Sequence, residues 1–181
     1  MAERDEELLG RIRGGDEEAM EELVARWYPH IHAYALRMTG GEQDAQDIAQ
    51  ETFLAVLQHV GRFRFRRKFQ SWIFTIAHHK CMDFFRLQGK FRGDPAELER
   101  LETADISQRI VDAVVLEQAI AQLPPLQREA LVLQSFHGFT ISEIANMTHT
   151  PPSTVQWRLS AAKNRLAASM EGREHERDHG T

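Results

Sequence analysis

Apolar residues recur at helical spacing along most of this chain, and no stretch alternates apolar and polar residues over enough positions to form a strand. Helical spacing places apolar side chains along one face, which must pack against another element. We therefore predict an all-α fold. The chain has 181 residues, 42% of them hydrophobic, so it can bury one core of moderate size or two small ones.

Glycines and capping residues mark the helix ends in the first half. Gly14 and Gly15 end a short helix, and Asp16 caps the next one, which has acids in its first turn where the helix dipole favours them. That second helix ends at Gly40 and Gly41. These signals predict helices over about residues 3–12, 17–39, 42–59 and 69–87.

The helical pattern lapses between residues 88 and 107. This stretch contains Gly89, Gly93 and Pro95 among charged residues, which is typical of a flexible acidic linker. The break implies two domains. We expect a first domain over residues 1–90, a linker over 91–107, a second domain over 108–170 and a disordered tail over 171–181.

The second domain carries the pattern of a helix-turn-helix. A first helix is interrupted by two consecutive prolines, and a second covers about residues 126–136. Thr140 and Glu143 form a capping box at the start of a short third helix. A tight turn over residues 148–151 leads to a last helix over about residues 152–170.

The last helix presents a polar face suited to the edges of base pairs. Its predicted buried stripe is Val155, Leu159, Ala162 and Leu166. The residues turned outward are mostly hydrogen-bonding ones, namely Ser153, Gln156, Trp157, Ser160 and Asn164. Arg158 and Arg165 on one flank, with Lys163 on the other, are expected to contact phosphates on either side of a major groove.

The charges are segregated along the chain. The net charge is −5, yet the stretch from Arg62 to Arg92 holds nine cations and a single acid, Asp83. The N-terminal third has a clear excess of acids. This distribution presents one basic face to a polyanion, while the acidic faces suit a basic protein partner.

The basic stretch interleaves cations with aromatic rings, which attract phosphates and stack on unpaired bases. Around Phe63 and Phe65 the cations are Arg62, Arg64, Arg66, Arg67 and Lys68. A wheel of the following helix turns Phe69, Ile73, Ile76, Ala77 and Phe84 toward a core and Thr75, His78, Met82 and Arg86 away from it. Trp72, His79 and Arg86 line one edge, which suits single-stranded DNA. Composition alone is equally compatible with a plain core helix that follows a solvated basic loop.

A line of acids, Asp44, Asp47 and Glu51, runs along the helix over residues 42–59. Its spacing alone favours a solvated face near a helix N-terminus over a docking strip for another protein.

Cysteine content and hydropathy restrict the class of protein. Cys81 is the only cysteine, so there is no internal disulfide and no zinc motif built on cysteine pairs. No apolar run is long enough to span a membrane, and the N-terminus lacks the basic and apolar parts of a signal peptide. We expect a cytoplasmic protein with no membrane insertion.

A metal-binding sensor or hydrolase is an alternative that the residues support poorly. His78, His79 and Cys81 are close in sequence, and His175 and His179 share a face of the tail, but each group is too small for a closed metal site. The line of acids lacks a general base or a phosphate loop beside it. We predict no enzyme activity, no catalytic residue, no metal site and no cofactor.

Motifs in both halves of the chain follow a known order. The first half contains Asp44-Ala-Gln-Asp47-Ile-Ala-Gln-Glu51-Thr-Phe53 and Phe69-Gln-Ser-Trp72-Ile-Phe-Thr-Ile-Ala77. The second half contains Leu123-Pro-Pro-Leu-Gln-Arg128-Glu, Glu143-Ile-Ala145 and Ser153-Thr-Val155-Gln-Trp-Arg158-Leu. Together, over residues 8–166, they resemble the extracytoplasmic-function group of bacterial sigma-70 factors.

The resemblance implies a subunit that directs core RNA polymerase to promoters. The residues that match the helix docking on the β′ clamp helices are Asp44, Asp47, Gln50 and Glu51. The resemblance therefore favours a docking strip over a solvated face for the line of acids. The β flap is a further expected contact. The residues that match the segment opening the minus-ten element are Arg62, Arg64, Arg66, Arg67, Lys68, Trp72, Thr75, His78, His79 and Arg86. The residues expected to read the minus-thirty-five element are Ser153, Thr154, Gln156, Trp157, Arg158, Ser160, Lys163 and Arg165.

The resemblance also implies control by an anti-sigma factor, often membrane-anchored and responsive to stress. The chain departs from the family at His79, where Asn is usual, at Gln156, where Lys is usual, and at the turn over residues 148–150, where a Leu-Gly-Ile-like sequence is usual. The promoter sequence therefore does not carry over, although Gln156 can pair with an adenine edge.

A stand-alone helix-turn-helix regulator of duplex DNA is the alternative reading. It accounts for the second domain but leaves the line of acids and the helix over residues 69–87 without a role.

Overall fold

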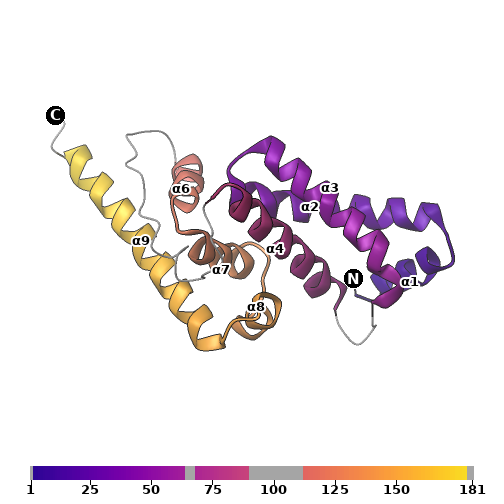
Figure 1. Ribbon diagram of the computed structural model, residues 1–181. Coiled ribbons are helices and arrows are strands. Elements are labelled where there is room, and N and C mark those ends of the chain that lie inside the picture. Colours follow the sequence, from indigo (N-terminus) through magenta and orange to yellow (C-terminus); the bar gives the residue numbers. More distant parts are fainter. Residues whose placement is uncertain (1, 64–67, 90–111, 179–181) are drawn as a thin grey trace. The chain divides into compact units, whose positions relative to one another are not determined.

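The computed structural model describes residues 2–63, 68–89 and 112–178, and every element within these ranges is a helix (Figure 1). The elements are α1 (Ala2–Arg13), α2 (Glu17–Thr39), α3 (Glu42–His59), η1 (Val60–Arg62), α4 (Phe69–Leu87), α6 (Asp112–Ala121), α7 (Pro125–Ser135), α8 (Ile141–Thr148) and α9 (Pro152–Asp178). The predicted all-α fold is confirmed. The helices of the first half begin and end at or next to the predicted residues.

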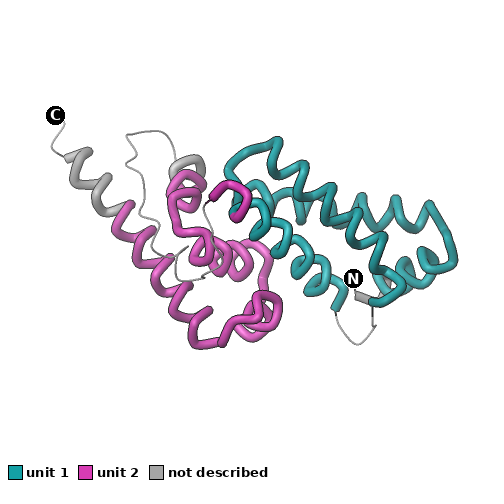
Figure 2. Tube along the Cα trace, in the orientation of Figure 1, with its two compact units in different colours: residues 1–85 teal, residues 86–181 magenta. Residues whose placement is uncertain are grey.

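The chain divides into two compact units, which cover residues 1–85 and 86–181 (Figure 2). Unit 1 contains α1, α2, α3, η1 and nearly all of α4, and unit 2 contains α6, α7, α8 and α9. The expected linker over residues 91–107 lies outside the described residues.

In unit 1, local signals define both ends of α2. The Asp16 carboxylate accepts a hydrogen bond from the backbone N–H of Ala19 at 3.1 Å and so caps the first turn. At the other end, Gly40 has a φ of 76° and donates its N–H to the carbonyl of Leu36 at 2.8 Å. Glycine suits this left-handed position because it has no Cβ. The predicted face of α2 is buried, namely Leu23, Trp27, Ile31, Tyr34 and Met38.

α4 buries more of its circumference than predicted. The ring of Phe74 on α4 packs edge-on against the ring of Tyr34 on α2, with the ring centroids 5.5 Å apart. The buried residues of α4 are Phe69, Ile73, Phe74, Ala77, His78, Cys81, Met82 and Phe85. The expectation that His78 and Met82 point away from the core is therefore wrong. The helical wheel assumed one buried stripe, and that assumption fails for α4 because its apolar residues are spread around most of the helix axis.

In unit 2, Arg128 of α7 closes the end of α6. Its guanidinium donates hydrogen bonds to the carbonyl of Ala121 and, at 3.0 Å, to that of Leu123. Ala121 is the last residue of α6 and Leu123 lies just beyond it, so neither carbonyl has a partner further along that helix. Burial lowers the pKa of Arg128 to about 10.

α8 and α9 form the predicted helix-turn-helix. The Thr140 hydroxyl accepts a hydrogen bond from the N–H of Glu143 at 3.2 Å, and the Glu143 carboxylate accepts one from the N–H of Thr140 at 3.0 Å. This is the predicted capping box. α8 ends at Thr148, and the residue that follows, His149, has a φ of 52° in the left-handed region. The predicted stripe of α9 is buried at Val155, Leu159 and Ala162, whereas its fourth residue, Leu166, is only half-buried.

The last helix continues past its expected end. We expected it to end near Met170, but α9 is helical as far as Asp178. Part of the segment expected to be a disordered tail is therefore helical. Its glutamates and arginines are strong helix formers, which explains why a charged sequence prolongs the helix.

Candidate functional site

α3 carries the acidic strip, defined here as Asp44, Asp47, Gln50 and Glu51. Asp44 is half-buried and the other three residues are exposed. Gln43 donates a hydrogen bond to Asp47 at 3.3 Å, and Lys80 of α4 forms an ion pair with Glu51 at 3.1 Å. The strip lies on the surface of unit 1, where another protein can reach it.

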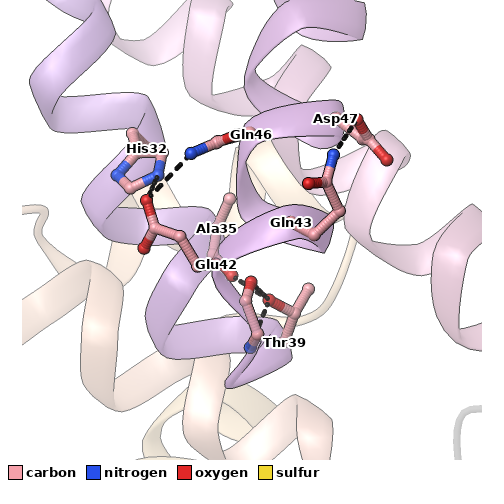
Figure 3. A network of polar contacts seen from close by, with 8 residues as sticks. His32, Ala35, Thr39, Glu42, Gln43, Gln46 and Asp47 are labelled. Atoms are coloured by element: carbon pink, nitrogen blue, oxygen red, sulfur yellow. Dashed lines mark hydrogen bonds and ion pairs between the residues drawn. The ribbon is translucent and has the colours of Figure 1, made fainter.

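A polar network at the junction of α2 and α3 fixes the start of the acidic strip (Figure 3). The Glu42 carboxylate contacts the ring Nε2 of His32 at 3.1 Å and accepts a hydrogen bond from the side-chain amide of Gln46 at 3.1 Å. At the end of α2, the hydroxyl of Thr39 donates a hydrogen bond to the backbone carbonyl of Ala35 at 2.9 Å. Of these contacts, the one between His32 and Glu42 joins the first turn of α3 to α2.

An open apolar groove of about 560 Å³ lies between α2 and α3. It is lined by Met20, Glu21, Val24, Ala25 and Tyr28 of α2 and by Gln50, Phe53, Leu54 and Leu57 of α3. Leu54 and Leu57 are 58% and 46% exposed, and Gln50 belongs to both the strip and the groove. Sequence reasoning missed this groove, although two leucines off the buried face of α3 were a usable signal.

The cations around Phe63 and Phe65 lie between the end of η1 and the start of α4. Arg62 and Lys68 are exposed, whereas Arg64, Arg66 and Arg67 lie outside the described residues. Phe63 is only 5% exposed, and its ring centroid lies 4.9 Å from that of Trp72. Phe63 was expected to be a stacking surface for bases, but its ring is packed inside the unit.

The predicted DNA residues of α4 differ in exposure. Trp72 and Thr75 are half-buried, and the Thr75 hydroxyl donates to the carbonyl of Ser71 at 2.7 Å. His79 and Arg86 are exposed, as the predicted edge requires. His78 is only 8% exposed, although its ring centroid lies 5.3 Å from that of the exposed His79. The roles of these residues at DNA stay predictions.

α9 exposes most of its predicted reading face. The exposed residues are Ser153, Gln156, Trp157, Ser160, Lys163, Asn164 and Arg165, while Thr154 is half-buried. Trp157 is 52% exposed. Lys163 donates to the amide oxygen of Gln134 on α7 at 3.5 Å.

Arg158 differs from the other residues of this face. It was expected on an exposed flank of α9, but it is 5% exposed and donates to the hydroxyl of Thr150 at 3.4 Å. Its placement was therefore predicted wrongly, because its long side chain folds back onto the turn that precedes α9. A phosphate contact by Arg158 stays a prediction.

The described part of the chain holds no cluster of three or more His, Cys, Asp or Glu side chains suited to a metal ion. Nor does any helix in the described ranges have both the length and the apolar character needed to cross a bilayer.

Comparison with known families assigns each unit to a separate model. Residues 23–91 match the model described as Sigma-70 region 2, and residues 113–166 match the one described as Sigma-70, region 4. The first match contains the acidic strip and α4, and the second contains α7, α8 and the exposed face of α9.

Individual proteins resemble the chain over most of their length. RNA polymerase sigma factor CarQ of Myxococcus xanthus is 31% identical over 164 residues, which are 87% of this chain and 92% of CarQ. ECF RNA polymerase sigma factor SigW of Bacillus subtilis is 28% identical over 176 residues, 90% of this chain and 94% of SigW. The structure of CnrH in complex with the cytosolic domain of CnrY aligns with a TM-score of 0.69 and 27% identity, over 93% of this chain and 98% of CnrH.

Proposed function

This chain belongs to the extracytoplasmic-function group of the sigma-70 family, which directs core RNA polymerase to particular promoters, and we propose which of its surfaces make the contacts. The observation that carries the proposal is that the described residues form three surfaces of different chemistry, two in unit 1 and one in unit 2. These are the acidic strip beside an apolar groove on α3, the cations and Trp72 around the start of α4, and the polar face of α9.

The acidic strip and the groove form the proposed dock for the clamp helices of the polymerase β′ subunit. Carboxylates of Asp47 and Glu51 attract cationic side chains over a distance, which speeds encounter. Leu54 and Leu57 then lose their contact with water when a helix covers the groove, which supplies apolar burial. Unit 2 supplies a second proposed contact, at the β flap.

The start of α4 forms the proposed surface for opening the minus-ten element. Arg62 and Lys68 are exposed cations that can hold the phosphates of a displaced strand. Trp72 is a half-buried ring on which an unpaired base can stack, and such stacking contributes roughly 1–3 kcal/mol per base. Stacking of this size helps to offset the cost of unpairing.

α9 forms the proposed reader of the minus-thirty-five element. Gln156 and Trp157 are exposed on the same face as Ser153 and Ser160. The amide of Gln156 suits an adenine edge, and the ring of Trp157 suits the methyl group of thymine. Exposed Lys163 and Arg165 suit the flanking phosphates.

We also propose control by an anti-sigma protein that covers part of these surfaces. The similar CnrH was solved in complex with another protein, the cytosolic domain of CnrY. The chain itself catalyses no reaction on this proposal and acts in the cytoplasm, as a dissociable specificity subunit of polymerase, with residues 1–90 and 108–170 as its two working domains.

Transcription in vitro tests the proposal. Core polymerase transcribes a fragmented genomic library with and without the full chain, and the new start sites are mapped. We expect new starts that share two spaced upstream elements. If folded protein and active core give no new starts, and the chain alone holds duplex DNA tightly in a gel shift, the stand-alone regulator is the correct assignment.

Two tryptophan variants separate the two DNA surfaces. Trp72→Ala should slow promoter opening while leaving closed binding close to wild type, because the ring contacts only an unpaired strand. Trp157→Ala should weaken closed binding, because it contacts the duplex. Equal loss of opening and closed binding in Trp72→Ala would remove that residue from strand capture.

A further inference from the structure

α1 is anchored at its first turn to the aromatic core of unit 1. The carboxylate of Asp5, 3% exposed, accepts hydrogen bonds from Arg26 at 2.5 Å and from the indole N–H of Trp27 at 3.3 Å. Both donors are on α2. A buried carboxylate held by a cation and an indole fixes the position of α1 on that helix.

At its last turn, α1 is anchored to a different element. Arg13 donates from Nε to the carbonyl of Val60 at 3.1 Å and from Nη2 to the carbonyl of Phe63. Val60 begins η1, and Phe63 follows it, with its own N–H bonded to the Val60 carbonyl at 3.2 Å. One planar guanidinium therefore holds both ends of the turn over residues 60–63.

The two anchors of α1 meet in one aromatic cluster, defined here as Trp27, Phe63, Phe69 and Trp72. The ring centroids of Phe63 and Trp72 are 4.9 Å apart, and those of Phe63 and Phe69 are 5.9 Å apart. Phe69 in turn contacts Trp27 at 5.7 Å. Asp5 thus fixes one edge of the cluster through Trp27, and Arg13 fixes another through the backbone of Phe63.

We propose that Arg13 is a positioning residue for promoter opening: by holding the turn over residues 60–63, it sets the orientation of the Trp72 ring. The inference rests on the proposed role of Trp72 in strand capture. Arg13 itself touches no DNA on this account, since its guanidinium is engaged by the two carbonyls. A lysine cannot replace it fully, because a single ammonium group lacks the fork that spans two acceptors.

Arg11 provides the matched control on the same helix. It is exposed, and its Nε pairs with Asp16 at 2.8 Å instead of contacting η1. Arg11→Ala therefore removes the same charge from α1 without changing the turn over residues 60–63.

The position of the Trp72 ring can be measured without polymerase. In the full chain, the indole ¹⁵N–H resonances are assigned through Trp72→Phe and recorded for each variant. Arg13→Ala should shift the Trp72 resonance and leave that of Trp157 unchanged, and Arg11→Ala should move neither. An unchanged Trp72 resonance in folded Arg13→Ala overturns the inference.

Opening is then measured with holoenzyme on a promoter taken from the start-site mapping. Permanganate reactivity of unpaired thymines should show that Arg13→Ala opens duplex promoter roughly tenfold more slowly, with an intermediate rate for Arg13→Lys. Affinity for core polymerase should stay within about twofold of wild type. A variant combining Arg13→Ala with Trp72→Ala should open no more slowly than Trp72→Ala alone.

The outcomes distinguish this inference from the proposed function. Normal opening in Arg13→Ala, with impaired opening in Trp72→Ala, overturns the inference and leaves strand capture by Trp72 standing. Normal opening in both variants removes Trp72 from strand capture, and the inference fails with it. A loss of affinity for core polymerase as large as the loss of opening overturns the inference as well, because it places Arg13 in docking on polymerase and not in positioning Trp72.

Discussion

Lys80 of α4 and Glu51 of α3 form an ion pair of 3.1 Å that joins the helix proposed to contact DNA to the helix proposed to contact polymerase. The side chain of Glu51 is 59% exposed and that of Lys80 is 31% exposed. Exposed pairs of this kind contribute only about 0–1 kcal/mol to stability. The pair therefore allows the role of Glu51 in docking to be tested with little disturbance of the fold.

Glu51→Gln should weaken binding to core polymerase by roughly tenfold, because it removes a charge from the acidic strip. Lys80→Gln is the control, since it breaks the same ion pair but leaves the strip intact, and its affinity should stay near wild type. Both are measured by equilibrium titration against labelled core. Equal loss in the two variants would show that the ion pair matters and the strip does not.

Arg165→Ala and Arg158→Ala should behave differently on promoter DNA. Arg165 is exposed, so its removal should lower the slope of log affinity against log salt by about 0.9, as for one lost phosphate contact. Arg158 is 5% exposed and bonded to Thr150, so its removal should mainly lower the Tm of unit 2. Binding measured across a salt series, with thermal unfolding of each variant, checks both. A lowered slope with unchanged Tm in Arg158→Ala would instead support the phosphate contact predicted for Arg158 from the sequence.

His149 offers a test of backbone strain at the helix-turn-helix. Its φ of 52° is costly for a β-branched residue and free for glycine. His149→Val should therefore be less stable than His149→Gly by about 1–2 kcal/mol in denaturant unfolding. Thr148→Val, one residue earlier at the end of α8, is the control. It should lower the free energy of unfolding by less than His149→Val does. Equal stability of the Val and Gly variants at position 149 would mean that the turn relaxes.

Asp16 should make stability depend on acid pH. Its pKa is lowered by the hydrogen bond from the Ala19 N–H and, next, by that from Arg11. Because the folded pKa lies below the unfolded one, the stabilisation is complete above the unfolded value of about 3.9 and is lost as pH falls through the folded pKa. Asp16→Asn keeps a capping oxygen but does not titrate. The Tm of wild type should therefore exceed that of Asp16→Asn at neutral pH, and the gap should close in acid. A gap that stays constant with pH would contradict the prediction.

Local signals made much of the fold predictable. Asp16 and Gly40 define the ends of α2, and Thr140 with Glu143 defines the start of α8, because each acts on a backbone group within a few residues. The buried stripe of α9 followed from its period alone. These features need no knowledge of what lies on the other side of the helix.

The errors arose where the position of a side chain depends on contacts outside its own helix. His78 and Met82 are buried because α4 is enclosed on more than one side, which its period does not reveal. The side chain of Arg158 bonds to Thr150 in the preceding turn, and a helical wheel places only its Cβ. Likewise, the groove lined by Leu54 and Leu57 exists only once α2 and α3 are packed together. The candidate residues were therefore easier to name than to place.

The complete burial of Cys81 makes this chain convenient for spectroscopy. A thiol with no solvent contact reacts slowly with maleimides, so the native protein should take up little dye. Cysteines introduced at Gln58 in unit 1 and at Ser169 in unit 2 would then carry a donor and an acceptor fluorophore while the native Cys81 stays in place. Energy transfer between them would follow the separation of the two units as polymerase engages the protein.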